Sequence, residues 1–268
     1  MADRTHRVQQ YRSALAGVDA MSLVSSHVFP RHAHDHFGIG VIAFGAQHSW
    51  SGIGPVDAGA GDTIMVNPGE MHDGAPLAGA ARGWHMLYFD PAVLAHQMAE
   101  EMTRPIEIAR PAVSDPMLAA RFQRLFVRLT APAPDLLAVE EDLLRSVMHV
   151  LRHHGVARPV AAGPSPAVAK ALQRLDEAPE LPVSLGELAA LSGVSRFQLL
   201  RGFARELGVT PHAYLVQRRV RLVRRLLAAG QPLAQAAGDA GFADQSHMTR
   251  AFVRQFGVTP GRYRAAIA

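Results

Sequence analysis

The chain has 268 residues, of which 49% are hydrophobic and 19% are charged, with a net charge of +4. This composition is typical of a folded protein, and at roughly 150 residues per domain it predicts two domains. The absence of cysteine excludes disulfides, thiolate metal sites and cysteine nucleophiles. No apolar run reaches the roughly 18 residues of a membrane-spanning helix, and the polar N-terminus lacks a secretory signal, so we expect a cytoplasmic protein without a membrane partner.

The charged residues are unevenly distributed along the chain. Residues 165–268 contain 14 Lys and Arg against 7 Asp and Glu, whereas residues 1–164 contain 13 against 16. Histidine has the opposite distribution, with 12 of the 14 before residue 155. This asymmetry indicates a nucleic-acid-binding part joined to a part with another task.

The first half contains short apolar runs separated by glycine and proline. They cover residues 38–45, 62–69 and 84–89. Short strands with turn signals between them predict a small β-sandwich or barrel. From Pro116 the apolar residues recur at helical spacing, first as Leu118, Phe122, Leu125 and Leu129, then as Leu136, Leu143, Val147 and Leu151. We therefore expect two amphipathic helices after the β region.

A stretch rich in proline, glycine and alanine, residues 159–166, is typical of a linker. It divides the chain into two expected domains, residues 1–158 and residues 167–268.

The part after the linker contains an internal repeat. Residues 185–195 align with 233–243, and residues 201–211 align with 250–260, both copies ending in Gly-Val-Thr-Pro. Each copy predicts a helix, a turn at a glycine (Gly193 or Gly241) and a second helix capped by Ser195 or Asp244. Two short helices around a glycine turn are typical of a helix-turn-helix, whose second helix enters the major groove of DNA.

On these second helices we expect Phe203 and Phe252 to face inward. The outward side chains, which could contact bases, are Arg196, Gln198, Arg201, Gln245, Ser246, His247, Thr249 and Arg250. Arginine can pair with guanine and glutamine with adenine. The alternative for one copy alone is an ordinary helical hairpin with a solvated basic face.

The connector between the copies predicts a third helix over residues 212–229, about 27 Å long. This is close to the roughly 34 Å of one DNA turn, so one monomer could present two helices to successive major grooves. Arginines on the remaining faces would neutralise phosphates, and the candidates are Arg218, Arg219, Arg221, Arg224, Arg225 and, on the last recognition helix, Arg254. Some of them would serve solubility alone.

The stretch AGDAGFADQSHMTRAFVRQFGVTPGRYR, residues 237–264, resembles the second helix-turn-helix of AraC/XylS-type bacterial transcription regulators. The resemblance extends through the connecting helix and the first copy. Leu200 departs from it, since that position of the first recognition helix is often polar. The resemblance implies a double-stranded DNA operator as partner, and RNA polymerase as a further partner if the protein is an activator.

Residues 27–90 look like the cupin-type sensor of the same family, on the segments FPRHAHD at 29–35, GD at 61–62, NPGEMHDG at 67–74 and GW at 83–84. The helices between residues 116 and 153 occupy the family's usual dimerisation position, which implies a homodimer. The expected fold class is α+β: an N-terminal cupin-like β-sandwich or barrel with dimerisation helices, then an all-α domain with two helix-turn-helix units.

His32 and His34 are two residues apart, so on a strand they would point to the same face, and His72 could lie opposite them. Three imidazoles with an open position could bind a divalent metal. Alternatively, they hydrogen-bond the mouth of the barrel or contact an organic effector, together with Trp84 and Tyr88.

Metal-dependent cupin enzymes usually carry a glutamate shortly after the paired histidines, but Phe37, Gly38 and Ile39 occupy that window here. His36, His48 or His85 could substitute for it. We therefore expect no enzyme but a regulator, most simply an activator, controlled by a small effector. The alternative is a metal-dependent cupin enzyme or a metal-ion sensor fused to a DNA-binding domain.

Overall fold

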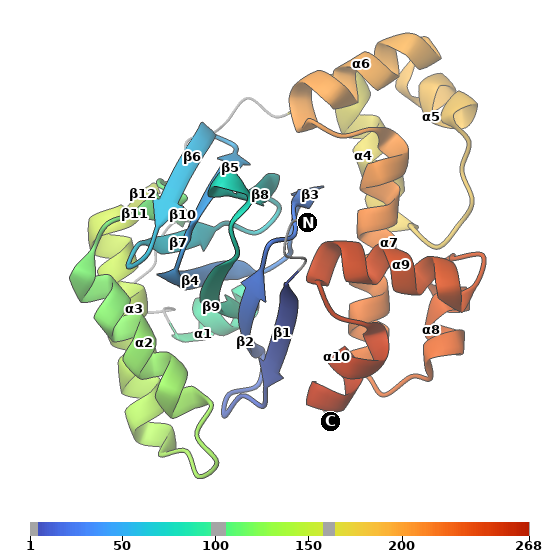
Figure 1. Cartoon of the computed structure of the whole chain (residues 1–268). Coiled ribbons are helices and arrows are strands. Elements are labelled where there is room, and N and C mark those ends of the chain that lie inside the picture. Colours follow the sequence, from blue (N-terminus) through green and yellow to red (C-terminus); the bar gives the residue numbers. More distant parts are fainter. Residues whose placement is uncertain (1–4, 98–105, 158–163, 268) are drawn as a thin grey trace. The chain divides into compact units, whose positions relative to one another are not determined.

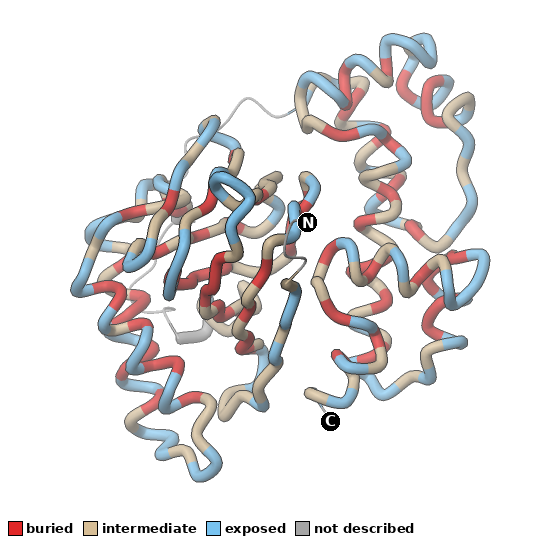
Figure 2. The backbone as a smooth tube through the Cα atoms, in the orientation of Figure 1, coloured by how far each residue is buried: buried red, intermediate tan, exposed pale blue. Residues whose placement is uncertain are grey.

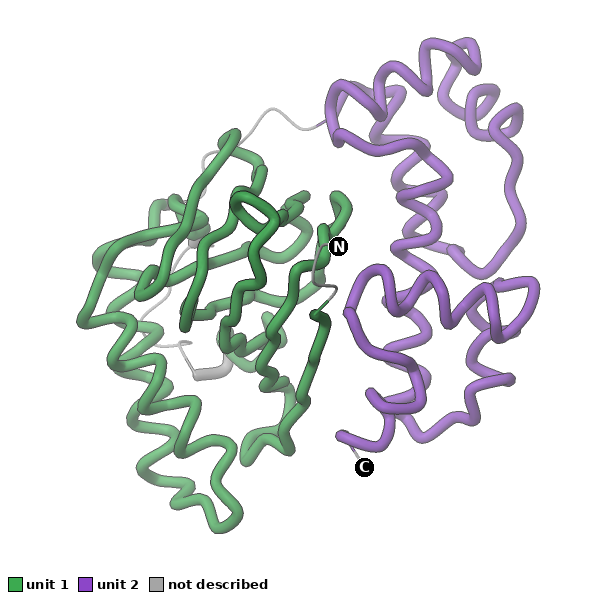
Figure 3. Tube along the Cα trace, viewed as in Figure 1, with its two compact units in different colours: residues 1–159 green, residues 160–268 purple. Residues whose placement is uncertain are grey.

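The computed structural model describes residues 5–97, 106–157 and 164–267. The chain divides into two compact units, residues 1–159 and 160–268 (Figure 3). We describe each unit by itself. None of the helices in the described ranges is long and apolar enough to cross a membrane.

Unit 1 is built on two antiparallel sheets (Figure 1). In the larger sheet the described strands follow the order β1 (His6–Tyr11), β2 (Val18–Ser25), β9 (Arg82–Phe89), β4 (Phe37–Phe44), β7 (Thr63–Val66) and β11 (Ala112–Val113). In the smaller sheet the order is β3 (Phe29–His32), β8 (His72–Pro76), β5 (Ala46–Ser51) and β6 (Gly54–Gly59). Two short strands, β10 (Ile106–Ile108) and β12 (Gly155–Ala157), pair separately. The predicted strands correspond to β4, β7 and β9.

The central strands of the larger sheet are apolar on both faces. On β9, Leu87 and Phe89 belong to a core shared with the helices that follow, whereas Trp84 and Met86 belong to a core shared with Phe29 of the smaller sheet. Alternate residues of a strand point to opposite faces. The register of β9 therefore decides which of its side chains lie between the two sheets.

The two predicted amphipathic helices are α2 (Pro116–Leu129) and α3 (Leu136–His154). Aspartates cap both of them: Asp115 accepts a hydrogen bond from the Leu118 amide, and Asp135 accepts one from the Ala138 amide. Buried residues recur along one side of each helix (Figure 2). A short helix, α1 (Pro91–Gln97), and a 3₁₀ turn, η1 (Leu77–Gly79), complete the described part of the unit.

Unit 2 is helical and shows the repeat found in the sequence. The first copy is α5 (Leu185–Ser192) and α6 (Arg196–Leu207), and the second is α8 (Leu233–Asp239) and α9 (Gln245–Phe256). Helix α7 (Pro211–Ala228) connects them, and α4 (Pro166–Glu177) and α10 (Pro260–Ile267) complete the unit (Figure 1). Both turns are made by glycines with positive φ, 68° at Gly193 and 77° at Gly241.

The predicted linker, residues 159–166, needs one correction. Residues 159–163 lie outside the described residues, but Pro166 is the first residue of α4 rather than part of a linker. Proline fits that position because its φ is already helical and because the first amide of a helix needs no partner within the helix.

Candidate functional site

Helix α6 begins with a reciprocal cap that involves one of the predicted base-reading residues. The Gln198 amide donates to Ser195 Oγ at 3.2 Å, and the Ser195 amide donates to Gln198 Oε1 at 2.9 Å. Gln198 is exposed, but its side-chain carbonyl oxygen already accepts a hydrogen bond in the cap of α6. Bidentate recognition of adenine would require Gln198 to leave this cap.

The remainder of α6 separates an inner from an outer face as predicted. Phe203 is fully buried, and Arg196 and Arg201 are exposed. The sequence analysis did not single out Phe197, which is 66% exposed and lies 5.6 Å from the Arg201 guanidinium. The available signal was its place between Arg196 and Gln198 in the first turn of the expected recognition helix, since apolar side chains can contact the thymine methyl group.

Asp244 caps helix α9, and its Oδ1 accepts a hydrogen bond of 2.6 Å from the His247 amide. Phe252 is fully buried, as predicted. Of the predicted base-contacting residues on this helix, Gln245, Ser246 and Arg250 are exposed, whereas His247 and Thr249 are half-buried. The ring of His247 packs edge-on against Phe242 at 5.2 Å, which limits its reach.

The arginines of α7 make contacts inside unit 2. Arg218 pairs with Asp176 at 2.8 Å, Arg219 donates to the Pro179 carbonyl at 2.7 Å, and Arg224 donates to the Tyr263 hydroxyl at 3.0 Å. Arg221 is buried, whereas Arg225 and Arg254, the latter on α9, are exposed. Most basic residues of α7 therefore bind neighbouring helices and loops, because α7 packs against α4, α8, α9 and α10.

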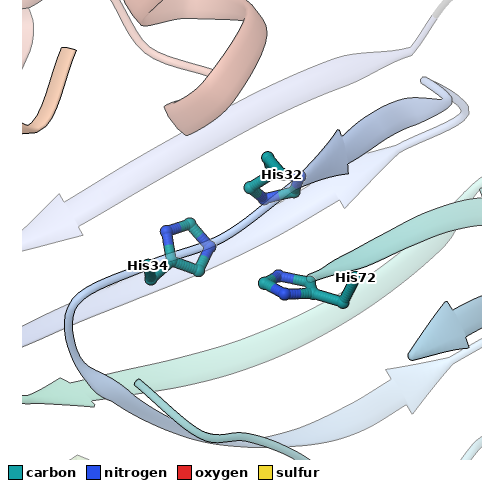
Figure 4. Close-up of side chains that lie close together, drawn as sticks. All are labelled: His32, His34 and His72. Carbon is teal, nitrogen blue, oxygen red and sulfur yellow. The ribbon is translucent and has the colours of Figure 1, made fainter. Parts of the chain in front are cut away.

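In unit 1 the structure brings His32, His34 and His72 together (Figure 4). His32 on β3 and His72 on β8 are direct cross-strand partners. The ring centroids lie 4.5 Å apart for His32 and His72, 4.7 Å for His32 and His34, and 5.0 Å for His34 and His72. One potential ligand atom from each residue lies within 4.8 Å of the others.

Backbone hydrogen bonds hold this cluster. The Gly69 amide donates to the His34 carbonyl at 2.6 Å, which fixes the 67–70 turn against the segment that carries His34. His32 Nδ1 donates to the Pro30 carbonyl at 2.7 Å, and His72 Nδ1 donates to the Glu70 carbonyl at 2.9 Å. These bonds place the proton on Nδ1 and the lone pair on Nε2, which is how proteins orient metal-binding or hydrogen-bonding imidazoles.

The other predicted effector residues have different positions. The Tyr88 ring lies 5.1 Å from His34, so β9 of the larger sheet contributes to the cluster. Trp84 instead packs against Phe29 in the core between the sheets, with the Arg82 guanidinium 4.9 Å from its ring.

Two of the proposed substitute histidines lie elsewhere. His85 points to the opposite face of β9 and stacks on Phe126 of α2 at 4.8 Å. His48 pairs with Asp57 at 2.6 Å on the surface. Within the described residues, the cluster consists of imidazoles and includes no carboxylate.

A fully buried arginine, Arg82, was missed in the sequence analysis. It donates to Gln47 Oε1 at 3.1 Å and to the backbone carbonyls of Ser25 and His27 at 3.3 and 3.2 Å. Burial lowers the pKa of Arg82 to about 10. The available signal was its position on β9, an even number of residues from Trp84, which directs it between the sheets.

Comparisons with known proteins agree with this arrangement. A family model for AraC-like ligand binding domains matches residues 24–145, and a helix-turn-helix domain model matches residues 188–266. The HTH-type transcriptional regulator YbfI of Bacillus subtilis (strain 168) is 29% identical over 225 residues, which are 82% of this chain and 81% of that protein. The transcriptional activator NphR of Rhodococcus sp is 39% identical over 83 residues, which are 31% of this chain and 24% of that protein.

Solved structures show the same fold. ToxT from Vibrio cholerae O395 matches with a TM-score of 0.56 at 11% identity, over 99% of both chains. A structure of wild-type ToxT with an unsaturated fatty acid bound matches with a TM-score of 0.55 at 12% identity, over 98% of this chain and 96% of that chain. The similarity of fold to ToxT therefore extends over both units of this chain.

Proposed function

Because this chain belongs to the AraC-type transcription regulators, we propose that α6 and α9 read one DNA operator while unit 1 binds the effector that controls it. The observation that carries the proposal is the duplicated unit, in which a capped helix buries one phenylalanine and exposes arginines on the other face. The relatives and the fold are those of regulators, and we assign no catalytic step to the chain.

The base contacts we propose are Arg196, Gln198 and Arg201 on α6, with Gln245, Ser246, His247, Thr249 and Arg250 on α9. Arg201 and Arg250 occupy the same position of the two copies, and both are exposed. Since α7 has 18 residues, it spans about 27 Å, which suits two major grooves about one turn apart. Phe197 adds an apolar contact. The phosphate contacts we propose are Arg218, Arg219 and Arg254, of which Arg254 is exposed.

The effector site we propose is formed by His32, His34, His72 and Tyr88. These side chains converge from both sheets and offer imidazole and phenol groups. Such donors suit the carboxylate of a small organic acid. Trp84 would contribute through the core that it shares with Phe29 rather than by direct contact with the histidines.

A divalent metal is the second candidate ligand for the same histidines. It is favoured by the hydrogen bonds from Nδ1 of His32 and His72 to backbone carbonyls, because metal-bound histidines almost always donate their other ring nitrogen in this way. Three imidazoles would leave a coordination position for a water molecule or an anionic effector.

We further propose that the protein is a homodimer that activates transcription through RNA polymerase. Helices α2 and α3 expose several large apolar side chains, namely Met117, Val127, Leu136, Leu137 and Leu144, which a partner subunit would cover. Activation is the task of the relative NphR. Sedimentation at micromolar concentration tests the dimer, and transcription in vitro with purified polymerase tests the sign of regulation.

The experiment that tests the proposed function is genomic footprinting with the purified full-length chain. We expect protection of a small number of sites that share a sequence motif, and the genes beside them indicate the effector class. Uniform, sequence-independent binding, or no binding at all, would contradict the proposal.

A further inference from the structure

A second cluster of metal-ligating side chains lies in unit 1, where α2 begins and α3 ends. His149 and His154 on α3 each place Nε2 2.8 Å from the same oxygen of Asp115, Oδ2. One ligand atom from each of the three residues lies within 4.8 Å of the others. This cluster belongs neither to the proposed effector site nor to the DNA-reading helices.

The carboxylate at the centre of this cluster is held in a fixed orientation. Asp115 Oδ1 accepts the hydrogen bond of the Leu118 amide that caps α2, so Oδ2 is the oxygen that faces the imidazoles. The end of α3 is fixed as well, since the Ala109 amide donates to the His154 carbonyl at 2.9 Å. Three ligands on a rigid framework need little rearrangement to bind an ion.

The ligand set is one that transition metals select. Two imidazoles and a carboxylate suit Zn²⁺ and its neighbours in the first row, with metal–ligand distances of about 2.0–2.2 Å. Ligands of a tetrahedral ion at that distance lie about 3.3 Å from one another. The imidazole nitrogens lie 2.8 Å from the carboxylate oxygen as hydrogen-bond donors, so the ligand atoms would have to separate by about 0.5 Å to admit an ion.

The surroundings allow an ion to enter from solvent. The three side chains are only 12–18% exposed, but His149 also lines a groove of about 430 Å³ on α2 and α3. The ring of His153, another residue lining this groove, lies 4.6 Å from that of His149, but the ligand atoms that lie within 4.8 Å of one another are those of Asp115, His149 and His154. Arginines of the groove oppose a cation, but Arg145 is already paired with Glu141, and Asp115 supplies a negative charge at the site.

We propose that Asp115, His149 and His154 form a binding site for a divalent transition metal ion of the Zn²⁺ class. The ion would replace the two hydrogen bonds to Asp115 Oδ2 and join the first turn of α2 to the last turn of α3. A bound ion would then stabilise the packing of α2 against α3 independently of the effector site.

The test uses the untagged full-length protein and Zn²⁺ alone, with the bound metal counted after dialysis and the affinity measured by calorimetry. The His149→Gln/His154→Gln variant should retain one equivalent of zinc less than the wild-type protein. A His32→Gln/His34→Gln/His72→Gln variant should keep that equivalent, which separates the two clusters. The exposed His212 provides the control: His212→Gln should bind like the wild-type protein.

A second variant keeps the test decisive if the histidine variant unfolds. Asparagine caps helices about as well as aspartate, so Asp115→Asn should preserve the fold while lowering zinc affinity about tenfold or more. In the wild-type protein, Co²⁺ should give the visible absorption of a four-coordinate site, and Asp115→Asn should weaken it. A wild-type protein that retains no zinc, or zinc binding unchanged in both variants, would overturn the proposal.

Discussion

Arg219 donates a hydrogen bond of 2.7 Å from Nε to the carbonyl oxygen of Pro179, which joins the connecting helix α7 to the segment after α4. A second bond from the same guanidinium reaches the Leu181 carbonyl at 3.4 Å. Arg219 therefore helps to hold the helices of unit 2 together. These bonds would compete with the predicted contact of Arg219 with phosphate.

Arg219→Ala should lower the free energy of unfolding by about 1–3 kcal/mol, because it leaves backbone carbonyls without their charged donor. It should change the salt dependence of DNA binding less than Arg254→Ala does. Arg254→Ala should behave in the opposite way, reducing the slope of log affinity against log salt by about 1 while changing stability by less than about 0.5 kcal/mol. Urea unfolding and salt titrations on random DNA measure both quantities. A reduced slope with unchanged stability for Arg219→Ala would show that this residue contacts phosphate instead.

The cap at Asp244 should determine the stability of α9. Asp244→Ala removes the acceptor of the His247 amide and should cost about 0.5–2 kcal/mol, whereas Asp244→Asn should cost much less because asparagine is an equally good cap. Thermal or urea unfolding of the two variants provides the comparison. Equal losses would mean that the charge of Asp244, rather than its cap, is what matters.

The stability of unit 1 should fall on acidification, in part through His85. Burial keeps the pKa of His85 below its ordinary value of 6.5, so the folded unit favours the neutral imidazole stacked on Phe126. As the pH falls below 6.5, the unfolded chain takes up the proton first, and the free energy of unfolding decreases. Between about pH 7.5 and about pH 5.5, His85→Leu should therefore lose less stability than the wild-type protein. Identical losses in urea unfolding would refute this contribution.

The double variant His32→Ala/His72→Ala should lose the response to effector while binding the operator normally in its absence. Both residues lie in unit 1, and the histidine cluster carries the proposed effector contacts. A reporter assay measures the response, and a gel-shift titration measures operator affinity. His48→Ala, on the surface of the same unit, is the matched control. A normal response in the double variant would place the effector elsewhere in the protein.

Local signals made the helical unit predictable. The caps at Ser195 and Asp244 and the glycine turns at Gly193 and Gly241 each depend on a few neighbouring residues, and the structure has all four. Because the unit is repeated, the same cap and turn signals occur twice in the sequence, which supported the prediction. The partners of the α7 arginines could not be predicted in this way, since Pro179 and Arg219 are 40 positions apart and meet only through packing.

The β unit was harder to predict because strand pairing is non-local. The sequence suggested that His32 and His34 share a face, but the pairing of His32 with His72 depends on the register between β3 and β8. By contrast, the alternation of faces along β9 is a local rule. Trp84 and His85 are adjacent in the sequence, yet one lies between the sheets and the other against α2. The Asp115 cluster was missed because His149 and His154 lie 34 and 39 positions after Asp115 in the sequence.

Selection from randomised DNA duplexes with the purified full-length protein tests the central claim most directly. The account predicts an enriched motif with two blocks about one helical turn apart. Arg201→Ala should flatten one block and Arg250→Ala the other, each by about 1–3 kcal/mol of base discrimination. A motif unchanged in both variants, or no enriched motif in the wild-type protein, would contradict the account.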